Sequence, residues 1–178
     1  HSSYIDIMLM FRMSKKPFVF VGKKELTKIP FFGYLYKRAA ITVDRSSFES
    51  RKEVYKNAIP FINKGYSICV FPEREYLDET ILLNQFKRGA FKIAIEHKLP
   101  ILPIVFLDCK RKFPWYTTHG FPGQLRAKAL DIIDTNAMNE KNINQLTDIM
   151  HKNISKELMH DPKQNAVKAI LVWKKITS

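Results

Sequence analysis

A histidine and an aspartate at the start of the chain form the first pair that could perform acid–base chemistry. His1 and Asp6 lie five positions apart, which separates them by roughly 140° in a helix and puts them on opposite faces of a strand. They can meet only if His1 lies in a loop and a helix begins near Ser2 or Ser3. Asp6 then lies in the first turn, where the helix dipole favours its charge. Its carboxylate could hold one imidazole nitrogen protonated and leave the other free as a base. The alternative is a surface histidine beside an aspartate at a helix start.

Charged side chains also follow three of the expected strands. Lys24 follows the first strand, Arg45 the second and Glu73 the third. In open parallel sheets, ligands bind outside the carboxyl ends of the strands. A guanidinium suits bidentate phosphate binding, and a carboxylate beside it can accept hydroxyl hydrogen bonds or hold the arginine in place. These positions predict a phosphate-binding site, with a purely structural ion pair between Arg45 and Glu73 as the alternative.

Short apolar strands alternate with amphipathic helices along the chain. The expected strands cover residues 17–21, 39–43, 66–71, 99–107 and 125–133. The expected helices run from Ser46 or Ser47 to a stop at Lys64-Gly65, over 86–97, and from about 143 to 158. Parallel strands joined in this way need helical crossovers on the sheet faces. We therefore expect an α/β fold, a mixed, mostly parallel sheet flanked by helices, in one domain over residues 1–178.

Composition narrows the function classes. The 178 residues are 46% apolar and carry a net charge of +13, which indicates one folded domain with an anionic partner. Two cysteines without metal-ligand spacing argue against a disulfide framework or a structural zinc site and favour a reducing compartment. The longest apolar run, 99–107, is broken by Pro100 and Pro103 and is far shorter than the ~18 residues of a membrane span.

Basic runs such as Lys110-Arg111-Lys112 lie near aromatic residues. That mixture could face nucleic acid or an anionic bilayer, and each run alone could be an ordinary solvated surface. Trp115, Tyr116 and Phe121 suit the headgroup level of a membrane, although loop packing explains them equally well. The sequence contains no phosphate-binding loop, nucleic-acid module or G-x-S-x-G motif.

Four sequence blocks in order then resemble one family. They are His1 and Asp6 as His-x4-Asp; residues 21–33 through to Arg45; Phe71-Pro72-Glu73 with the Phe-Lys-x-Gly-like segment 86–91; and Leu99-Pro100-Ile101-Leu102-Pro103-Ile104-Val105. Together they resemble the 1-acyl-sn-glycerol-3-phosphate acyltransferases of glycerolipid synthesis. The resemblance covers residues 1 to 105.

The resemblance implies a role for each site residue. His1 would be the general base for a glycerol hydroxyl, and Asp6 would orient and support its imidazole. Arg45, with Lys24 as a weaker candidate, would bind the acceptor's phosphate, and Glu73 would organise the acceptor pocket. The co-substrates would be an acyl thioester of coenzyme A or acyl carrier protein and a lysophospholipid such as 1-acyl-sn-glycerol 3-phosphate. No metal or other cofactor is implied.

One departure from the family pattern concerns the acceptor. Glu73 is followed by Arg74-Glu75-Tyr76 in place of the family's Gly-Thr-Arg, so Arg74 or a lysine of the loop is the candidate replacement. Glycerol 3-phosphate or another lysolipid is the alternative acceptor. A non-catalytic basic module that binds anionic lipid or nucleic acid is the alternative class, although nucleic acid has no positive signal. We expect a membrane-associated protein on the cytoplasmic face, with membrane-associating helices preceding His1.

Overall fold

A computed structural model describes residues 3, 5–23, 27, 34, 36, 40–43, 48–73, 81–114 and 119–163, with side chains 23, 48–52 and 55 excepted. The chain divides into two compact units. The first unit combines His1–Met13 with Pro72–Ser178, and the second unit is the intervening Ser14–Phe71. Each unit is described by itself, and the expectation of a single domain stays a prediction.

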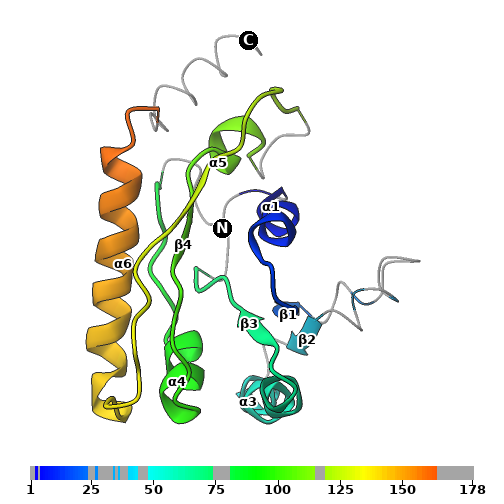
Figure 1. Ribbon diagram of the computed structural model, residues 1–178, viewed down its shortest axis with the longest axis vertical. Coiled ribbons are helices and arrows are strands. Elements are labelled where there is room, and N and C mark those ends of the chain that lie inside the picture. Colours follow the sequence, from blue (N-terminus) through cyan, green and yellow to red (C-terminus); the bar gives the residue numbers. More distant parts are fainter. Residues whose placement is uncertain are drawn as a thin grey trace. The chain divides into compact units, whose positions relative to one another are not determined.

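The second unit is a three-stranded parallel sheet with one crossover helix (Figure 1). Strand β1 (Phe18–Lys23) lies between β2 (Ala40–Val43) and β3 (Ser67–Cys69). Helix α3 (Phe48–Asn63) connects β2 to β3 and packs against both, as parallel strands require. The predicted α/β class with parallel strands is confirmed.

The predicted end of α3 at Lys64-Gly65 is also confirmed, and its geometry explains it. Gly65 has a φ of 77°, a conformation that glycine adopts without a steric penalty. Its N–H donates to the carbonyl of Ile62 at 2.9 Å, and the N–H of Tyr66 donates to the carbonyl of Phe61 at 3.0 Å. The rings of Phe61 and Tyr66 pack with centroids 6.0 Å apart. This is a Schellman motif with its apolar contact.

A glycine in β1 allows a close approach within the second unit. A Cβ atom added to Gly22 would lie 1.5 Å from the hydroxyl oxygen of Tyr36. Tyr36 is buried, so its ring has little space to retreat. The glycine of the Val21-Gly22-Lys23 block is therefore required by packing against this ring.

The first unit is built from four helices and a two-stranded antiparallel sheet in its described part. Its helices are α1 (Ile5–Met13), α4 (Gly89–Glu96), α5 (Cys109–Lys112) and α6 (Ile143–His160), with a 3-10 turn η2 (Glu140–Asn142) before α6. Its strands are β4 (Ile104–Phe106) and β5 (Ala127–Ala129). Helix α6 packs against α4 and β4, and Figure 1 shows it running alongside both. The core between the helices contains Phe86, Phe91, Ile95, Leu146 and Met150.

The fourth and fifth expected strands are shorter than predicted. In place of 99–107, β4 spans only Ile104–Phe106, and Ile101 forms a separate antiparallel bridge with Ile133. Pro100 and Pro103 have no N–H to donate, so a continuous ladder cannot form there. Of the described helices, none is both long and apolar enough to cross a bilayer.

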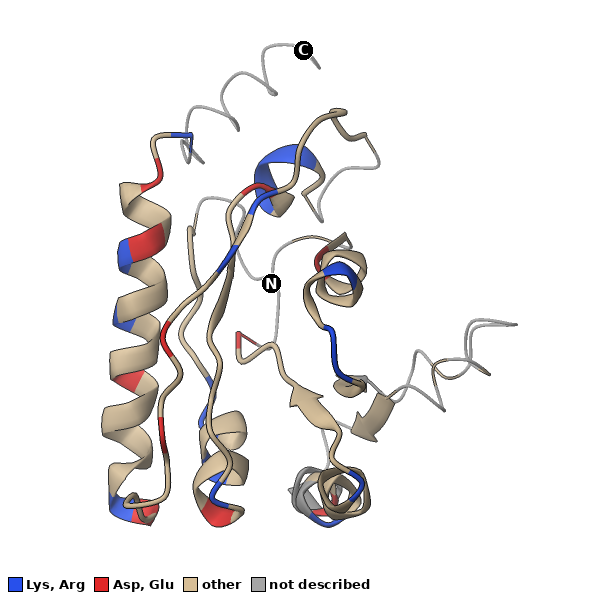
Figure 2. Cartoon of the chain, viewed as in Figure 1, with Lys and Arg blue, Asp and Glu red and all other residues tan. Residues whose placement is uncertain are grey.

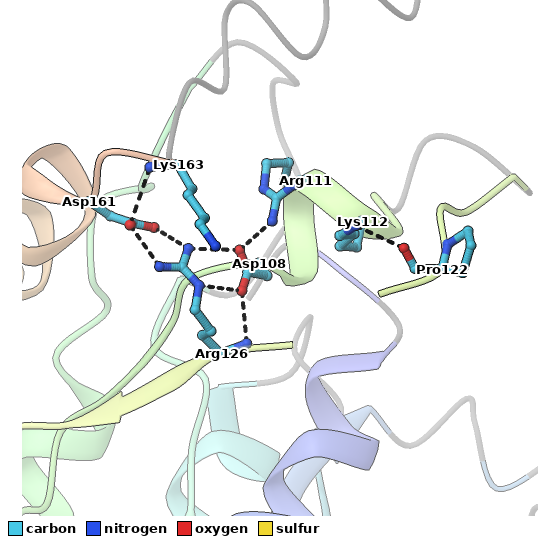
Figure 3. Close-up of polar contacts among 7 residues, drawn as sticks. All are labelled: Asp108, Arg111, Lys112, Pro122, Arg126, Asp161 and Lys163. Atoms are coloured by element: carbon cyan, nitrogen blue, oxygen red, sulfur yellow. Dashed lines mark hydrogen bonds and ion pairs between the residues drawn. The ribbon is translucent and has the colours of Figure 1, made fainter. Parts of the chain in front are cut away.

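A buried carboxylate joins three segments of the first unit (Figure 3). Asp108, directly after β4, is 1% exposed and accepts hydrogen bonds from Nε and Nη2 of Arg126 at 2.7 and 2.8 Å. Arg111 donates a further bond to Asp108 at 2.6 Å. The other side of the Arg126 guanidinium binds both oxygens of Asp161, at 2.9 and 2.6 Å. The Asp108 cluster, defined as these four residues, therefore connects β4, β5 and the end of α6.

The charges of the Asp108 cluster stabilise one another. Burial favours the neutral form of Asp108, but the hydrogen bonds from Arg126 and Arg111 outweigh it and hold the pKa of Asp108 well below its usual range. Hydrogen bonding to Arg126 also lowers the pKa of Asp161. Both carboxylates therefore stay ionised, and the cluster is a structural ion network.

The basic run at 110–112 also belongs to the internal structure. Helix α5 is almost entirely coloured as basic in Figure 2. Nevertheless, Lys110 is 9% exposed and donates to the carbonyl of Ile81, and Arg111 binds Asp108. Lys112 donates to the carbonyl of Pro122 at 2.9 Å. The expectation that this run is a solvated or ligand-facing surface is therefore wrong for Lys110, which ties α5 to residue 81.

The close approach of Gly22 to Tyr36 predicts a steric penalty. Gly22→Ala should lower the free energy of unfolding by about 1–3 kcal/mol, the usual cost of overpacking, measured by urea denaturation. In a Tyr36→Phe background the nearest atom is absent, so the same substitution should cost less. Equal penalties in the two backgrounds would show that the Tyr36 hydroxyl is not the obstacle.

The Asp108 cluster predicts a large effect for Arg126→Met. Removing the guanidinium leaves Asp108 buried, with Arg111 as its cationic partner among the described residues, and the free energy of unfolding at neutral pH should fall by about 3–5 kcal/mol. The matched control is Lys128→Met, which breaks an ion pair with Glu157 whose lysine is 53% exposed and should cost less than about 1 kcal/mol.

Measuring the stability of Arg126→Met and of the unaltered protein at low pH separates the loss of charge interactions from the loss of packing. Because the pKa of Asp108 is lowered by folding, its contribution is present above the usual carboxylate pKa and is lost as the pH falls through the lowered value. The difference between Arg126→Met and the unaltered protein should therefore shrink in acid. A difference that does not depend on pH would point to packing alone.

Candidate functional site

Asp6 lies where the spacing of the first motif requires it to lie. It occupies the first turn of α1, as predicted. Ser3 Oγ accepts a hydrogen bond from the N–H of Ile5 at 3.2 Å, and Asp6 Oδ2 accepts one from the N–H of Ser3 at 3.2 Å. This reciprocal arrangement is a capping box, which satisfies N–H groups at the helix start and fixes the carboxylate. Asp6 is 1% exposed, so its position is determined by the protein interior.

The start of α1 is attached to α5. Ser3 Oγ donates a hydrogen bond to the carbonyl oxygen of Phe113, the residue that ends α5. Cys109, the first residue of α5, is also buried, with 1% of its surface exposed. Burial and then the negative charge of Asp6 raise the pKa of this thiol far above its usual range. Cys109 therefore remains a protonated thiol.

Glu73, in the third motif, is a second buried carboxylate of the first unit. It is 7% exposed, and its Oε2 accepts a hydrogen bond from the N–H of Asn84 at 3.0 Å. The adjacent Pro72 accepts the N–H of Lys87 through its carbonyl at 2.9 Å. These contacts fold residues 81–87 back onto the motif. Since Lys110 binds the carbonyl of Ile81, α5 also reaches this segment.

Four of the six predicted site residues lie outside the described residues: His1, Lys24, Arg45 and Arg74. The pairing of His1 with Asp6, and the alternative pairing of Arg45 with Glu73, therefore stay predictions. The structure places Asp6 and Glu73 in the same unit, each buried and each held by a backbone N–H. Within the described part, no group of three histidine, cysteine or acidic side chains is arranged to hold a metal.

The described carboxylates can serve acid–base chemistry in different ways. A buried aspartate fixed by a capping box can orient and electrostatically support an imidazole without moving. A buried glutamate whose Oε2 accepts a backbone N–H can shape the wall of a pocket. The proposed chemistry also needs a general base, and the first motif assigns that role to His1.

Sequence reasoning missed the contribution of α5. The rule that ligand-binding residues follow parallel strands points to Lys24, Arg45 and Glu73, whereas α5 follows the fourth strand, which is antiparallel. There the chain reads Asp108-Cys109-Lys110, and all three side chains are buried. A polar run directly after an apolar strand was the available signal.

Comparisons with known proteins point to the same family as the four motif blocks. A family model described as "Acyltransferase" matches residues 1–107. A 1-acyl-sn-glycerol-3-phosphate acyltransferase of Cocos nucifera is 32% identical over 85% of this chain and 49% of its own length. One of Haemophilus influenzae is 31% identical over 87% of this chain and 66% of its own length. The chain thus spans about half to two thirds of these two relatives.

A solved structure shares the fold. The crystal structure of the 1-acyl-sn-glycerophosphate acyltransferase PlsC from Thermotoga maritima matches with a TM-score of 0.70 at 21% identity, over 90% of this chain and 64% of that one. The family model covers more than half of the chain and includes both His1 and Asp6. By this match and these relatives, the chain belongs to the acyltransferase family.

Proposed function

We propose that this protein transfers a fatty acyl group from an acyl thioester to the free hydroxyl of a lysophospholipid, giving phosphatidic acid from 1-acyl-sn-glycerol 3-phosphate. The observation that carries the proposal is the buried, capped Asp6 of the His-x4-Asp motif. The names of the relatives from Cocos nucifera and Haemophilus influenzae support the same acceptor.

In this mechanism His1 takes the proton of the acceptor hydroxyl as its oxygen attacks the thioester carbonyl. The carbon–oxygen bond forms, the carbon–sulfur bond breaks, and the thiolate leaves with the proton returned by the imidazolium. Asp6 holds the imidazole in the productive tautomer and stabilises its positive form. No covalent acyl-enzyme is required, because the two substrates react directly once they are held together.

The acceptor's phosphate is assigned to Arg45, with Lys24 and Arg74 as further cationic candidates, and Glu73 organises the acceptor pocket. The donor is acyl-coenzyme A or acyl carrier protein. The replacement of the family's Gly-Thr-Arg by Arg74-Glu75-Tyr76 favours a second possibility, in which the acceptor is glycerol 3-phosphate or a different lysolipid. Both possibilities use the same base and the same thioester chemistry.

The protein is also proposed to act at the cytoplasmic surface of an anionic membrane. Helix α1 reads Ile-Asp-Ile-Met-Leu-Met-Phe-Arg-Met, and its Met8 and Phe11 are 67% and 55% exposed. Large apolar side chains on one exposed helix can enter the headgroup region, and the net charge of +13 adds attraction to anionic lipid. Asp6 lies on this same helix, which would bring the site close to a lipid acceptor.

The proposed base predicts the outcome of a thiol-release assay on the full-length protein. His1→Ala should lower acceptor-dependent release from acyl-coenzyme A by about 10²–10⁴-fold, the range for loss of a general base, and Asp6→Asn should lower it in the same direction. His160→Ala, at the exposed end of α6, is the matched histidine control and should retain full activity.

The same assay identifies the acceptor and can reject the mechanism. It is run with 1-acyl-glycerol 3-phosphate, glycerol 3-phosphate and other lysolipids, and with acyl carrier protein as the second donor. Full activity of folded His1→Ala would exclude the proposed base. No release with any pair, combined with salt-sensitive binding to lipid vesicles, would favour the non-catalytic basic module.

The exposed face of α1 predicts a membrane-binding defect. Met8→Ser combined with Phe11→Ser should reduce flotation with vesicles of phosphatidylcholine and phosphatidylglycerol, because less apolar surface enters the bilayer. Met159→Ser, a methionine of α6 that is 68% exposed, is the control and should float like the unaltered protein. An equal loss in the control, or no loss in the α1 variant, would remove α1 from the membrane contact.

A further inference from the structure

A buried lysine joins α5 to the segment that folds back onto the third motif. Lys110 is buried, and its Nζ donates a hydrogen bond to the carbonyl oxygen of Ile81. Three residues further along, the N–H of Asn84 donates to Oε2 of Glu73 at 3.0 Å. Residues 81–87, here called the return segment, are therefore bonded to α5 at their start and to the motif carboxylate in their middle.

We propose that Lys110 is a positioning residue for Glu73, because it holds the start of the return segment and thereby keeps Asn84 against the carboxylate. This inference rests on the proposed function, since it assigns Lys110 a role in the acceptor pocket that Glu73 organises. Lys110 touches neither substrate in this proposal and acts through the return segment. It lies beyond residues 1–107, which the family model matches.

The start of the return segment depends on this bond because its side chain packs little. Ile81 is 43% exposed, so burial of its side chain contributes little to holding the backbone there. Further along, Phe86 is buried in the core, with its ring centroid 6.2 Å from that of Phe91. Asn84 lies between these two points. Loss of the Lys110 bond should therefore loosen the segment around Asn84 without unfolding the core.

Lys110 is a firm attachment point because its surroundings in α5 are fixed. Asp108, two residues before it, and Arg111, directly after it, are bonded to each other at 2.6 Å. A buried ammonium group also depends on acceptors from the protein itself, so losing a carbonyl partner is costly. The end of the same helix is bonded to the first motif, from Ser3 Oγ to the carbonyl of Phe113. Helix α5 thus links the return segment to the start of α1.

Amide hydrogen exchange, followed by NMR, tests the contact without turnover. Lys110→Met keeps most of the apolar stem and removes the ammonium donor. Exchange of the Asn84 amide should then become about tenfold faster or more, the scale of a lost hydrogen bond from a charged donor. Lys110→Arg retains a charged donor and should recover most of the protection. The matched control is Lys112→Met, which removes another bond from α5 to a carbonyl, that of Pro122, and should leave Asn84 unchanged.

Kinetics test the consequence for the acceptor. In the thiol-release assay on the full-length protein, Lys110→Met should raise KM for 1-acyl-glycerol 3-phosphate by about threefold or more, because the pocket is less often in its binding-competent form. KM for acyl-coenzyme A should stay unchanged, since Glu73 is assigned to the acceptor alone. Lys110→Arg should restore the acceptor KM, and Lys112→Met should alter neither constant.

The outcomes separate this inference from the proposed function. Unchanged exchange at Asn84 in folded Lys110→Met would overturn the proposal, and a raised acceptor KM beside it would mean that the lysine itself binds the acceptor. Faster exchange with unchanged KM and kcat would also reject it, leaving the bond a structural role. Should Lys110→Met not fold, Lys110→Gln, which keeps a shorter uncharged donor, takes its place in both measurements. If the unaltered protein releases no thiol while exchange at Asn84 responds, the proposed function is wrong and the bond serves structure alone.

Discussion

The need to neutralise one buried carboxylate organises the first unit. Asp108 can remain charged in the interior only because Arg126 and Arg111 donate to it, and Arg126 in turn requires Asp161 to complete its own bonding. The three segments that carry these residues are thereby fixed together. Since α5 begins with the next residue, its bonds to Ser3 and to the carbonyl of Ile81 depend on this anchor. The segments that bond to Ser3 and to residue 81, next to the two motif carboxylates, are therefore held by an ion network that lies outside the motifs.

The basic residues of the chain fall into two groups, those that bind acceptors within the protein and those that can face an anionic ligand. Lys110, Arg111, Lys112 and Arg126 donate to acceptors of the protein itself, so they contribute to the net charge without being free to attract a ligand through those bonds. A sequence count does not distinguish such residues from those that face an anionic lipid or a phosphate. The net charge of +13 therefore includes cations of both kinds.

Local features of this fold were predictable, and distant pairings were not. The first turn of α1 and the glycine that ends α3 depend on neighbouring residues, so capping rules were enough to place Asp6 and Gly65. The shortening of β4 followed from Pro100 and Pro103, a local effect that the strand prediction underweighted. By contrast, Ser3 meets Phe113 from 110 positions away, and Arg126 meets Asp108 from 18 positions away. Periodicity carries no information about which distant side chains pair.

The discontinuous first unit has a consequence for synthesis. Ser3 at the start of α1 bonds to Phe113, which lies 110 residues later, so this helix cannot reach its final partners until α5 has left the ribosome. At the usual ~5–20 residues per second, translation imposes a delay of roughly 5–20 s. During that interval the apolar α1, with Met8 and Phe11 outward even in the finished fold, is available to chaperones or to a nearby bilayer. The helix that carries Asp6 is thus made well before the segment that binds its start.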